Sequence, residues 1–164
     1  MSNTAANLQE AFAGESQANR KYLAYAKQAE RDGHPQVAKL FRAVAAAETI
    51  HAHAHLRAMG GIGSTVDNLK AAIEGETHEF TDMYPAMIEA AKAEGHKAAA
   101  RSFTYANEVE KVHAALYREA LANLDALAET DYHVCAVCGH TVAGAAPEKC
   151  VVCGANARAF EKID

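Results

Sequence analysis

The sequence predicts an all-α four-helix bundle followed by a small metal-binding module of strands and loops. Residues 1–130 are rich in Ala, Glu, Lys and Leu, whereas residues 131–164 contain all four cysteines. With 164 residues, 50% of them hydrophobic and only three prolines, the chain is long enough for one domain plus a module and lacks the composition of a disordered protein. We therefore place the domain boundary near Tyr132, with a bundle over residues 1–130 and a module over residues 131–164.

Three interruptions divide the first 130 residues into four predicted helices. They are Gly33-His34-Pro35, the segment 60–65 and Gly95-His96, all rich in residues that start or stop helices. The proline suits a first helical turn, Ser64 or Thr65 can cap the third helix, and the glycines suit positions just after a helix end. Each helix then spans roughly 25 to 30 residues, or about 40 Å. Helices of similar length joined by short loops favour a bundle.

Ionisable residues interrupt the apolar stripe near the middle of every predicted helix. An unpaired charge in a bundle core is costly, so these groups need a compensating partner. Since residues i and i+3 share a helix face, the two members of a Glu-x-x-His pair can reach the same ion. In chain order the residues are Glu15; Glu48 and His51; Glu76 and Glu79; and Glu110 and His113.

The second half of the predicted bundle repeats the first half. Gly14-Glu15-Ser16 recurs as Gly75-Glu76-Thr77, and each Glu-x-x-His pair begins seven residues after a phenylalanine, at an offset of 61 to 62 residues. This duplication would bring two equivalent ligand sets together across a pseudo-two-fold axis. One residue breaks the repeat, because Glu79 stands where the first half has Ala18. We interpret Glu79 as a seventh ligand, with a salt-bridged neighbour of the site as the alternative.

This donor set indicates a site for two metal ions. One glutamate from each of two helices, together with a Glu-x-x-His pair from each of the other two, can hold two ions in a bundle core. Carboxylate and imidazole ligands suit iron or manganese. A single Glu-x-x-His pair is weak evidence, but two pairs at matched offsets are strong. The alternative is that all six residues face solvent.

Further polar side chains lie near the predicted site. Tyr22 and Tyr84 are one to two helical turns from the site glutamates, where a phenol can hydrogen-bond a ligand and supply a proton. The alternative is that both are ordinary core aromatics. His55 shares the face of His51 and is expected in the core or beside the ligands. The histidines expected in solvent are His34, His78, His96, His133 and His140.

The tail contains two Cys-x-x-Cys-Gly motifs, formed by Cys135, Cys138, Cys150 and Cys153. Four thiolates in this spacing are typical of a closed tetrahedral metal site. A structural zinc ribbon and a rubredoxin-type iron site share these ligands, and two disulfides are a third interpretation. Because about 30 residues bury little apolar surface, we expect the module to fold only around its ion.

Charge and hydropathy exclude two classes of partner. The formal net charge of −5 argues against a nucleic-acid-binding protein, whose surface is usually basic. No apolar run approaches the ~20 residues that span a bilayer, so no membrane partner is expected. The first residues lack the basic and apolar regions of a secretory signal, and a cytoplasmic location is the default expectation.

The ordered set of these motifs resembles rubrerythrin along essentially the whole chain. It comprises Glu15, the two Glu-x-x-His pairs, Glu76-x-x-Glu79 and the short-loop cysteine tail. The resemblance implies a ferritin-like bundle with two iron ions and a rubredoxin-like module with one, although zinc fits the four cysteines equally. It also implies a non-haem iron peroxidase that reduces hydrogen peroxide to water. Electrons would pass through the four-cysteine iron centre from a reductase or rubredoxin that NAD(P)H supplies.

The resemblance assigns roles to the matching ligand residues. The bridging carboxylates of the family are matched by Glu48 and Glu110, its terminal ligands by Glu15 and Glu76, and its fixed histidine by His113. Together with His51 these five residues form the six two-fold ligands that ferritin and bacterioferritin share. Only the seventh carboxylate and the cysteine module set the rubrerythrin pattern apart.

The resemblance also implies a change of ligand with redox state. In the family one iron moves, exchanging the carboxylate matched by Glu79 for the histidine matched by His51. Tyr22 and Tyr84 match tyrosines beside the ligands. We therefore expect these four residues to be catalytic. The second cysteine motif departs from many relatives, which have a proline where this chain has Val151-Val152, so the redox potential and the metal of the tail stay open.

The resemblance implies a homodimer or larger homo-oligomer. A bundle about 40 Å long is expected to hold its tail far from its own central site. Delivery of electrons between head-to-tail subunits is therefore expected, and exchange of helices between subunits would preserve every ligand.

Two other functions remain as alternatives to the peroxidase. One is a ferroxidase or iron-handling protein, and the other is a zinc-ribbon interaction protein with a structural bundle site.

Overall fold

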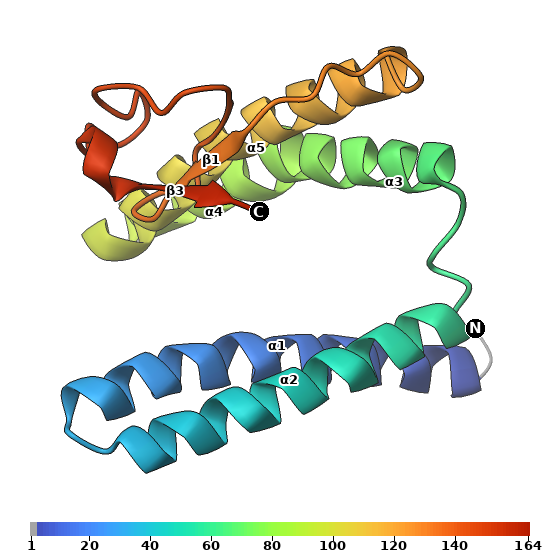
Figure 1. Cartoon of the computed structure of the whole chain (residues 1–164), viewed down its shortest axis with the longest axis vertical. Coiled ribbons are helices and arrows are strands. Elements are labelled where there is room, and N and C mark those ends of the chain that lie inside the picture. The colour runs from blue at the N-terminus through green and yellow to red at the C-terminus, as the bar shows by residue number, and fades with distance from the viewer. Residues whose placement is uncertain (1–2) are drawn as a thin grey trace. The chain divides into compact units, whose positions relative to one another are not determined.

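The first unit of the chain is a hairpin of two long helices. The computed structural model describes residues 3–164 and divides the chain into two compact units, one ending at Gly63 and one running Ser64–Asp164. In the first unit α1 (Asn3–Arg31) and α2 (Pro35–Ala58) run antiparallel, as Figure 1 shows. The connecting turn has Gly33 at φ +80°, a conformation that favours glycine, and Pro35 starts α2 as the sequence predicts.

Small residues and one polar side chain hold this hairpin together. Near the turn, Ala26, Ala29 and Ala38 form a buried seam. Near the middle, the buried Asn19 side chain on α1 donates its Nδ2 hydrogens to the carbonyl oxygen of Ala45, at 2.7 Å, and to a hydroxyl oxygen on α2. Because both acceptors lie on α2, these bonds fix the two helices against each other beside the predicted site.

The second unit contains the other helical segments. They are α3 (Thr65–His78), the π-helical turn η1 (Glu79–Met83), α4 (Tyr84–Ala93) and α5 (Lys97–Ala122). Ser64 begins α3 with a capping box, in which its hydroxyl accepts the backbone N–H of Asp67 and the Asp67 carboxylate accepts the N–H of Ser64. The long α5 packs along both α3 and α4.

The third predicted helix contains a π-helical turn that no sequence motif indicates. The sequence predicts a kink at Pro85, one turn or so beyond Glu79, and this kink stays a prediction. What the structure shows is that the helix widens from Glu79 onward, where the backbone N–H of Tyr84 donates to the carbonyl oxygen of Glu79, five residues back. Proline has no N–H for the bond that an α-helix would need at its position, and the wider turn just before it absorbs that mismatch.

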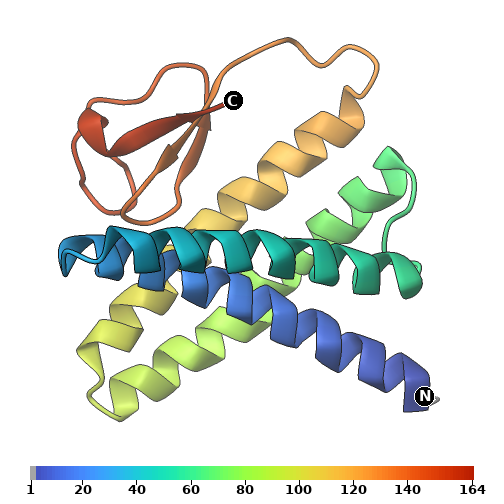
Figure 2. The same cartoon turned by 60° about the horizontal axis from the view of Figure 1, so that its bottom comes forward.

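The C-terminal module is a three-stranded antiparallel sheet with two loops. Its strands are β1 (Tyr132–Cys135), β2 (Thr141–Ala143) and β3 (Phe160–Ile163), in the order β2-β1-β3, with a 3-10 turn η2 (Ala157–Ala159) before β3. Figure 2 shows the strands and loops as a compact group near the C-terminus. Its core is formed by Cys135, Cys150 and Phe160.

The predicted fold class is confirmed. If α3, η1 and α4 are counted as one helix, the described residues form four helices that are separated where the sequence predicts. They are followed by a strand-and-loop module with four clustered cysteines. The compact units divide the chain at residue 63 rather than between the bundle and the module. The boundary at residues 130 and 131 stays a prediction. Within residues 3–164, no helix is long and apolar enough to span a bilayer.

Candidate metal centres

The first cluster of candidate ligands lies on the α1–α2 hairpin. Glu48 and His51 are three residues apart on α2, and Glu15 faces them from α1. Nδ1 of His51 lies 3.0 Å from a Glu48 carboxylate oxygen and 3.8 Å from one of Glu15. The three side chains thus offer two carboxylates and one imidazole within reach of a single ion.

The second cluster repeats this geometry in the other unit. Glu110 and His113 lie on α5, and Glu76 faces them from α3. Nδ1 of His113 is 2.7 Å from a Glu110 carboxylate oxygen and 3.6 Å from one of Glu76. The repeat seen in the sequence is therefore a repeat in three dimensions, with one Glu-Glu-His group for each unit.

Glu76 is a half-buried carboxylate whose negative charge is not balanced by its neighbours. Its Oε2 atom is buried and has no hydrogen-bond partner among the described residues. Burial, followed by the hydrogen bond and negative charge of Glu110, raises the pKa of Glu76 to about 7, although His113 acts in the opposite direction. A cation bound here would remove both penalties.

Glu79 and Tyr84 lie at the edge of the second cluster. Burial and then the charge of Glu76 raise the pKa of Glu79, whereas the nearby histidines lower it. Burial and then the charge of Glu79 raise the pKa of Tyr84, whose phenol already carries its proton at neutral pH at the ordinary value near 10. Glu79 is outside the tightest group of ligand atoms, which contains Glu76, Glu110 and His113.

The two site tyrosines occupy equivalent positions in the repeat. The Tyr22 ring packs against Phe41 at a centroid distance of 6.0 Å, and the Tyr84 ring packs against Phe103 at 6.2 Å. These ring contacts agree with the alternative given in the sequence analysis, in which both tyrosines are core aromatics. Tyr84 has in addition the electrostatic contact with the site carboxylates, and the catalytic role of both tyrosines stays a prediction.

The sulfur atoms of the four cysteines form one compact group. Sγ of Cys135 lies 3.7 Å from Sγ of Cys153, and Sγ of Cys138 lies 3.5 Å from Sγ of Cys150. Four sulfurs at about 2.3 Å from a central ion form a tetrahedron with edges of about 3.8 Å, close to these separations. None of the four is in a disulfide, so the disulfide interpretation is wrong.

Each Cys-x-x-Cys motif closes in the same way. The N–H of Gly139 donates to the carbonyl oxygen of Cys135, and the N–H of Gly154 donates to that of Cys150. Both glycines have φ between +76° and +85°, where a side chain would be strained. At Cys150 burial is the largest influence and opposes ionisation, but backbone N–H donors and the hydrogen bonds of neighbouring cysteine thiols together lower the pKa of the thiol to about 7.

Two histidines of the module are not where the sequence analysis expects them. His140 is only 6% exposed, with its ring edge-on to Phe160, and His133 is half-buried and lies 2.7 Å from the carbonyl oxygen of Gly144. The expectation of solvent exposure is wrong for both, because the periodicity of helices does not apply to short strands and loops. By contrast His34, His78 and His96 are exposed as predicted, and His96 accepts the N–H of Ala99 at the start of α5.

The sequence analysis missed Thr141, which joins the module to the second cluster. Its hydroxyl oxygen lies 3.0 Å from Nε2 of His113, 28 residues earlier in the chain. The tail therefore reaches a central histidine of its own chain, contrary to the expectation that a long bundle holds the two apart. No motif contains Thr141, and only the packing of the module on α5 reveals it.

The arrangement of the side chains fits the metal ions that their donor atoms suggest. Carboxylate and imidazole ligands suit iron, and four thiolates suit iron or zinc. The buried Oε2 of Glu76, which has no hydrogen-bond partner among the described residues, and the sulfur separations are independent signs that each group of side chains is arranged around a cation.

Comparison with known proteins agrees with both centres. The family model for rubrerythrin matches residues 6–121, and the model for the rubrerythrin rubredoxin-like domain matches residues 133–161. Rubrerythrin-2 of Clostridium acetobutylicum is 36% identical over 96% of this chain and 95% of its own length. Nigerythrin of Nitratidesulfovibrio vulgaris is 37% identical over 92% of this chain and 81% of its own length.

Solved structures give the same relationship. The fully reduced, all-ferrous state of nigerythrin superposes with a TM-score of 0.61 at 36% identity, covering 99% of this chain and 88% of that chain. With family matches across both parts of the sequence, this chain belongs to the rubrerythrin family, whose di-iron site and rubredoxin-like four-cysteine site its residues fit.

Proposed function

We propose that this protein reduces hydrogen peroxide to water. Each turnover consumes one peroxide, two electrons and two protons, and yields two water molecules. When it holds iron, the four-cysteine site would supply one-electron transfer to the carboxylate–histidine site, with a reductase or rubredoxin that NAD(P)H supplies as the source of the electrons. Membership of a family with both kinds of centre supports an iron-based oxidoreductase function, and the choice of peroxide is our proposal.

The two Glu-Glu-His groups are, in this proposal, halves of one di-iron site. Glu48 and Glu110 would hold the ions as shared carboxylates, Glu15 and Glu76 as terminal carboxylates, and His113 as a fixed imidazole. The partner of each half would be the other half of the same chain or that of a second copy. Glu79 and His51 would complete the set, as the two side chains whose binding to the metal changes with redox state.

The observation that carries the proposal is that one compact unit holds both kinds of cluster and that a hydrogen bond links the module to the carboxylate cluster. In the unit Ser64–Asp164, the second carboxylate cluster and the cysteine cluster are joined through Thr141 and His113. When bound, iron supplies the one-electron steps that the protein's own side chains cannot. The Tyr84 phenol, whose pKa burial and the site carboxylates raise, holds a proton beside the site.

A ferroxidase or iron-handling function is the second candidate. The six two-fold ligands favour this function, because iron oxidation at such a site requires only iron and oxygen. Glu79 and the cysteine centre argue for the peroxidase, since iron oxidation by oxygen needs neither of them.

The first test follows both centres in one experiment. The protein is purified without oxygen, its iron and zinc are quantified, and the reduced form receives one equivalent of hydrogen peroxide. We expect about three irons per chain and the red absorbance of the ferric four-cysteine centre as peroxide disappears. Zinc in the cysteine site, or a cysteine iron that stays reduced, would shift the assignment to iron handling.

Glu79→Ala separates the two candidate functions. For the peroxidase we expect peroxide turnover to fall at least about 10-fold, equal to roughly 1.4 kcal/mol of transition-state stabilisation. The oxidation of added ferrous iron by oxygen should stay within about two-fold of wild type, a difference of roughly 0.4 kcal/mol. Glu74→Ala is the matched control, because Glu74 is an exposed residue of the same helix. Equal peroxide turnover in the two variants contradicts the role of Glu79.

A further inference from the structure

Thr141 occupies a position between the two centres that none of the recognised motifs explains. Its hydroxyl donates a hydrogen bond to the carbonyl oxygen of Gly139 at 3.1 Å, and the same oxygen lies 3.0 Å from Nε2 of His113. A threonine hydroxyl has one hydrogen, so while it donates to Gly139 its oxygen is an acceptor toward His113. The geometry therefore favours a proton on Nε2 of His113.

This arrangement suits a histidine that binds metal through its other nitrogen. Nδ1 of His113 faces Glu110 and Glu76, at 2.7 and 3.6 Å. A ligating imidazole needs a free lone pair on the nitrogen that meets the ion, and an acceptor for the hydrogen on the opposite nitrogen. Thr141 supplies that acceptor, and the bond also fixes the rotation of the ring.

The equivalent histidine of the first unit is held differently. Nδ1 of His51 faces Glu48 and Glu15 in the same way, but within residues 3–164 the structure records no hydrogen bond to its Nε2. The His51 side chain is 55% exposed, against 26% for His113. Of these two equivalent histidine rings, the described residues of the module hydrogen-bond that of His113 and not that of His51.

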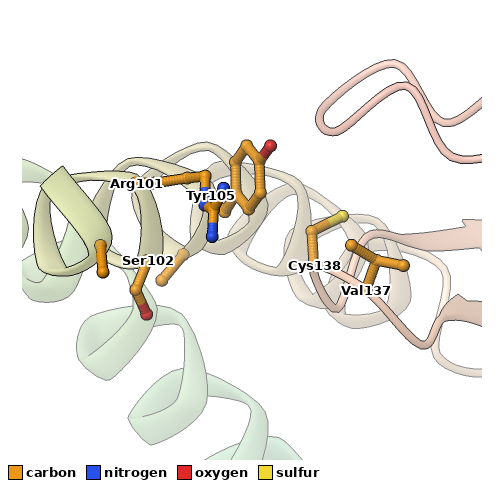
Figure 3. A pocket seen from close by; sticks show the side chains of 7 residues that line it. Arg101, Ser102, Tyr105, Val137 and Cys138 are labelled. Atoms are coloured by element: carbon orange, nitrogen blue, oxygen red, sulfur yellow. The ribbon is translucent and has the colours of Figure 1, made fainter.

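The module packs on α5 around the Thr141–His113 hydrogen bond, and this region of contact between the module and α5 is called the seam below. A Cβ atom built on Gly139 would lie 3.8 Å from the Val109 side chain, so the first cysteine loop is in near contact with the helix. His140, between Gly139 and Thr141, is buried. An adjoining cavity of about 550 Å³ is lined from both α5 and the module. Figure 3 shows its lining side chains, which include Arg101, Ser102, Tyr105, Val137 and Cys138.

The seam also provides a short covalent and hydrogen-bonded route between the centres. Gly139 follows Cys138 directly, its carbonyl accepts the Thr141 hydroxyl, and that hydroxyl meets the His113 ring. Two hydrogen bonds therefore connect the peptide next to a cysteine ligand with an imidazole of the carboxylate cluster.

We propose that Thr141 is a positioning residue that fixes His113 for metal binding and couples the cysteine centre to the carboxylate–histidine site of the same chain. The electron-coupling half of this inference rests on the proposed function, whereas the metal-binding half does not. For each electron passed, the cysteine iron is oxidised from ferrous to ferric and one iron of the other site is reduced from ferric to ferrous.

The test compares three variants of the full chain. Thr141→Val removes the hydroxyl with little change in shape, and Thr141→Ser restores it. Thr104→Val is the matched control, because the Thr104 hydroxyl donates only to the Ala100 carbonyl within its own helix. Retention of the four-thiolate spectrum reports that the module is folded, and Thr141→Ala replaces Thr141→Val if that spectrum is lost.

The first measurement is metal affinity without turnover. Cobalt(II) is titrated into protein whose cysteine site already holds zinc, and the visible absorbance of cobalt at the carboxylate–histidine site is followed. We expect the affinity to fall about 10-fold or more in Thr141→Val, in the range usual for groups that orient a ligand. It should recover in Thr141→Ser and be unchanged in Thr104→Val. Equal affinities in Thr141→Val and Thr104→Val would overturn the positioning role.

The second measurement is the rate of electron transfer. Reduced, iron-loaded protein is mixed with hydrogen peroxide, and the appearance of the ferric four-cysteine centre is timed. We expect this step to slow at least about 10-fold in Thr141→Val and to recover in Thr141→Ser, whereas an unchanged rate would overturn the coupling role. If wild type itself transfers no electron to peroxide, the proposed function fails while the cobalt titration still decides the role in positioning.

Discussion

At the scale of single residues, the ligand set follows from a few side chains at fixed spacing. Each Glu-x-x-His pair needs only the geometry of one helix to bring its two members together. The structure places Glu48 with His51 and Glu110 with His113, as the spacing predicts. The roles of individual residues in metal binding and catalysis stay predictions.

Glu76 gives a prediction about pH. Its pKa is about 7 in the folded, metal-free protein against an ordinary value of 4.5, chiefly because of burial. The folded state therefore binds the proton more tightly than the unfolded state. This contribution to stability is fully present below about pH 4.5 and is lost as the pH rises through about 7.

We therefore expect the metal-free helices to melt at a lower temperature at about pH 8 than at about pH 5, by at least about 2 °C, or roughly 0.5–1 kcal/mol. Far-UV circular dichroism measures this melting. Glu76→Gln should reduce the difference, because the amide does not titrate, and the exposed residue Glu74 changed to Gln should leave it as in wild type. A difference that survives in Glu76→Gln would assign the pH effect to other groups.

At the scale of elements, the π-helical turn is the feature that local propensity does not specify. Glu79, the residue that breaks the repeat, is also the first residue of η1. A π-helical turn contains one more residue than the α-helical turn it replaces, so it re-aims the side chains at its start while the helix beyond keeps its direction. The extra carboxylate and the irregular backbone thus occur together.

Deletion of Thr81 tests this relationship. Thr81 is an exposed residue of η1, and its removal should return the segment to regular α-helix. We expect an unchanged or higher melting temperature, with peroxide turnover reduced at least about 10-fold because Glu79 no longer points to the site. Thr81→Ala keeps the chain length and should retain turnover. Full activity in the deletion variant would show that the wide turn does not position Glu79.

At the scale of the whole molecule, the α1–α2 hairpin buries few large apolar side chains of its own. Its buried apolar residues are all alanines, and over the described residues the largest fully buried side chain is that of Cys135, in the module. On α2, Leu40 is 61% and Ile50 is 66% exposed. Helices gain most of their stability from packing of an apolar face, so these faces call for a partner.

We accordingly expect a dimer or larger assembly in solution, measured by analytical ultracentrifugation of the iron-loaded protein. Leu40→Glu and Ile50→Glu should each weaken it about 10-fold or more, because burying one such side chain contributes roughly 1.5–3 kcal/mol. Gln36→Glu introduces the same charge at an exposed position of α2 and should have little effect. A monomer at every concentration, or equal behaviour of the three variants, would contradict this expectation.

The sequence by itself determined the parts that depend on neighbours along the chain. Helix breaks at Gly33, Gly60 and Gly95, the Glu-x-x-His pairs and the two cysteine motifs are set by backbone preferences and by spacings of three or four residues. Such terms act within a turn or two of helix or within one loop. They can be deduced without knowing what packs against them.

Only the tertiary structure decided which distant groups meet. The bond between His113 and Thr141 spans 28 residues, His140 is buried against Phe160, and the helix widens at Glu79. Burial and long-range contacts depend on how the module packs on α5, and the wide turn depends on how the missing N–H of a proline is absorbed. The two long-range contacts leave no periodic signal in the sequence, because they are properties of surfaces that meet only after folding. The wide turn is local, but a proline in a helical segment does not by itself specify where the helix widens.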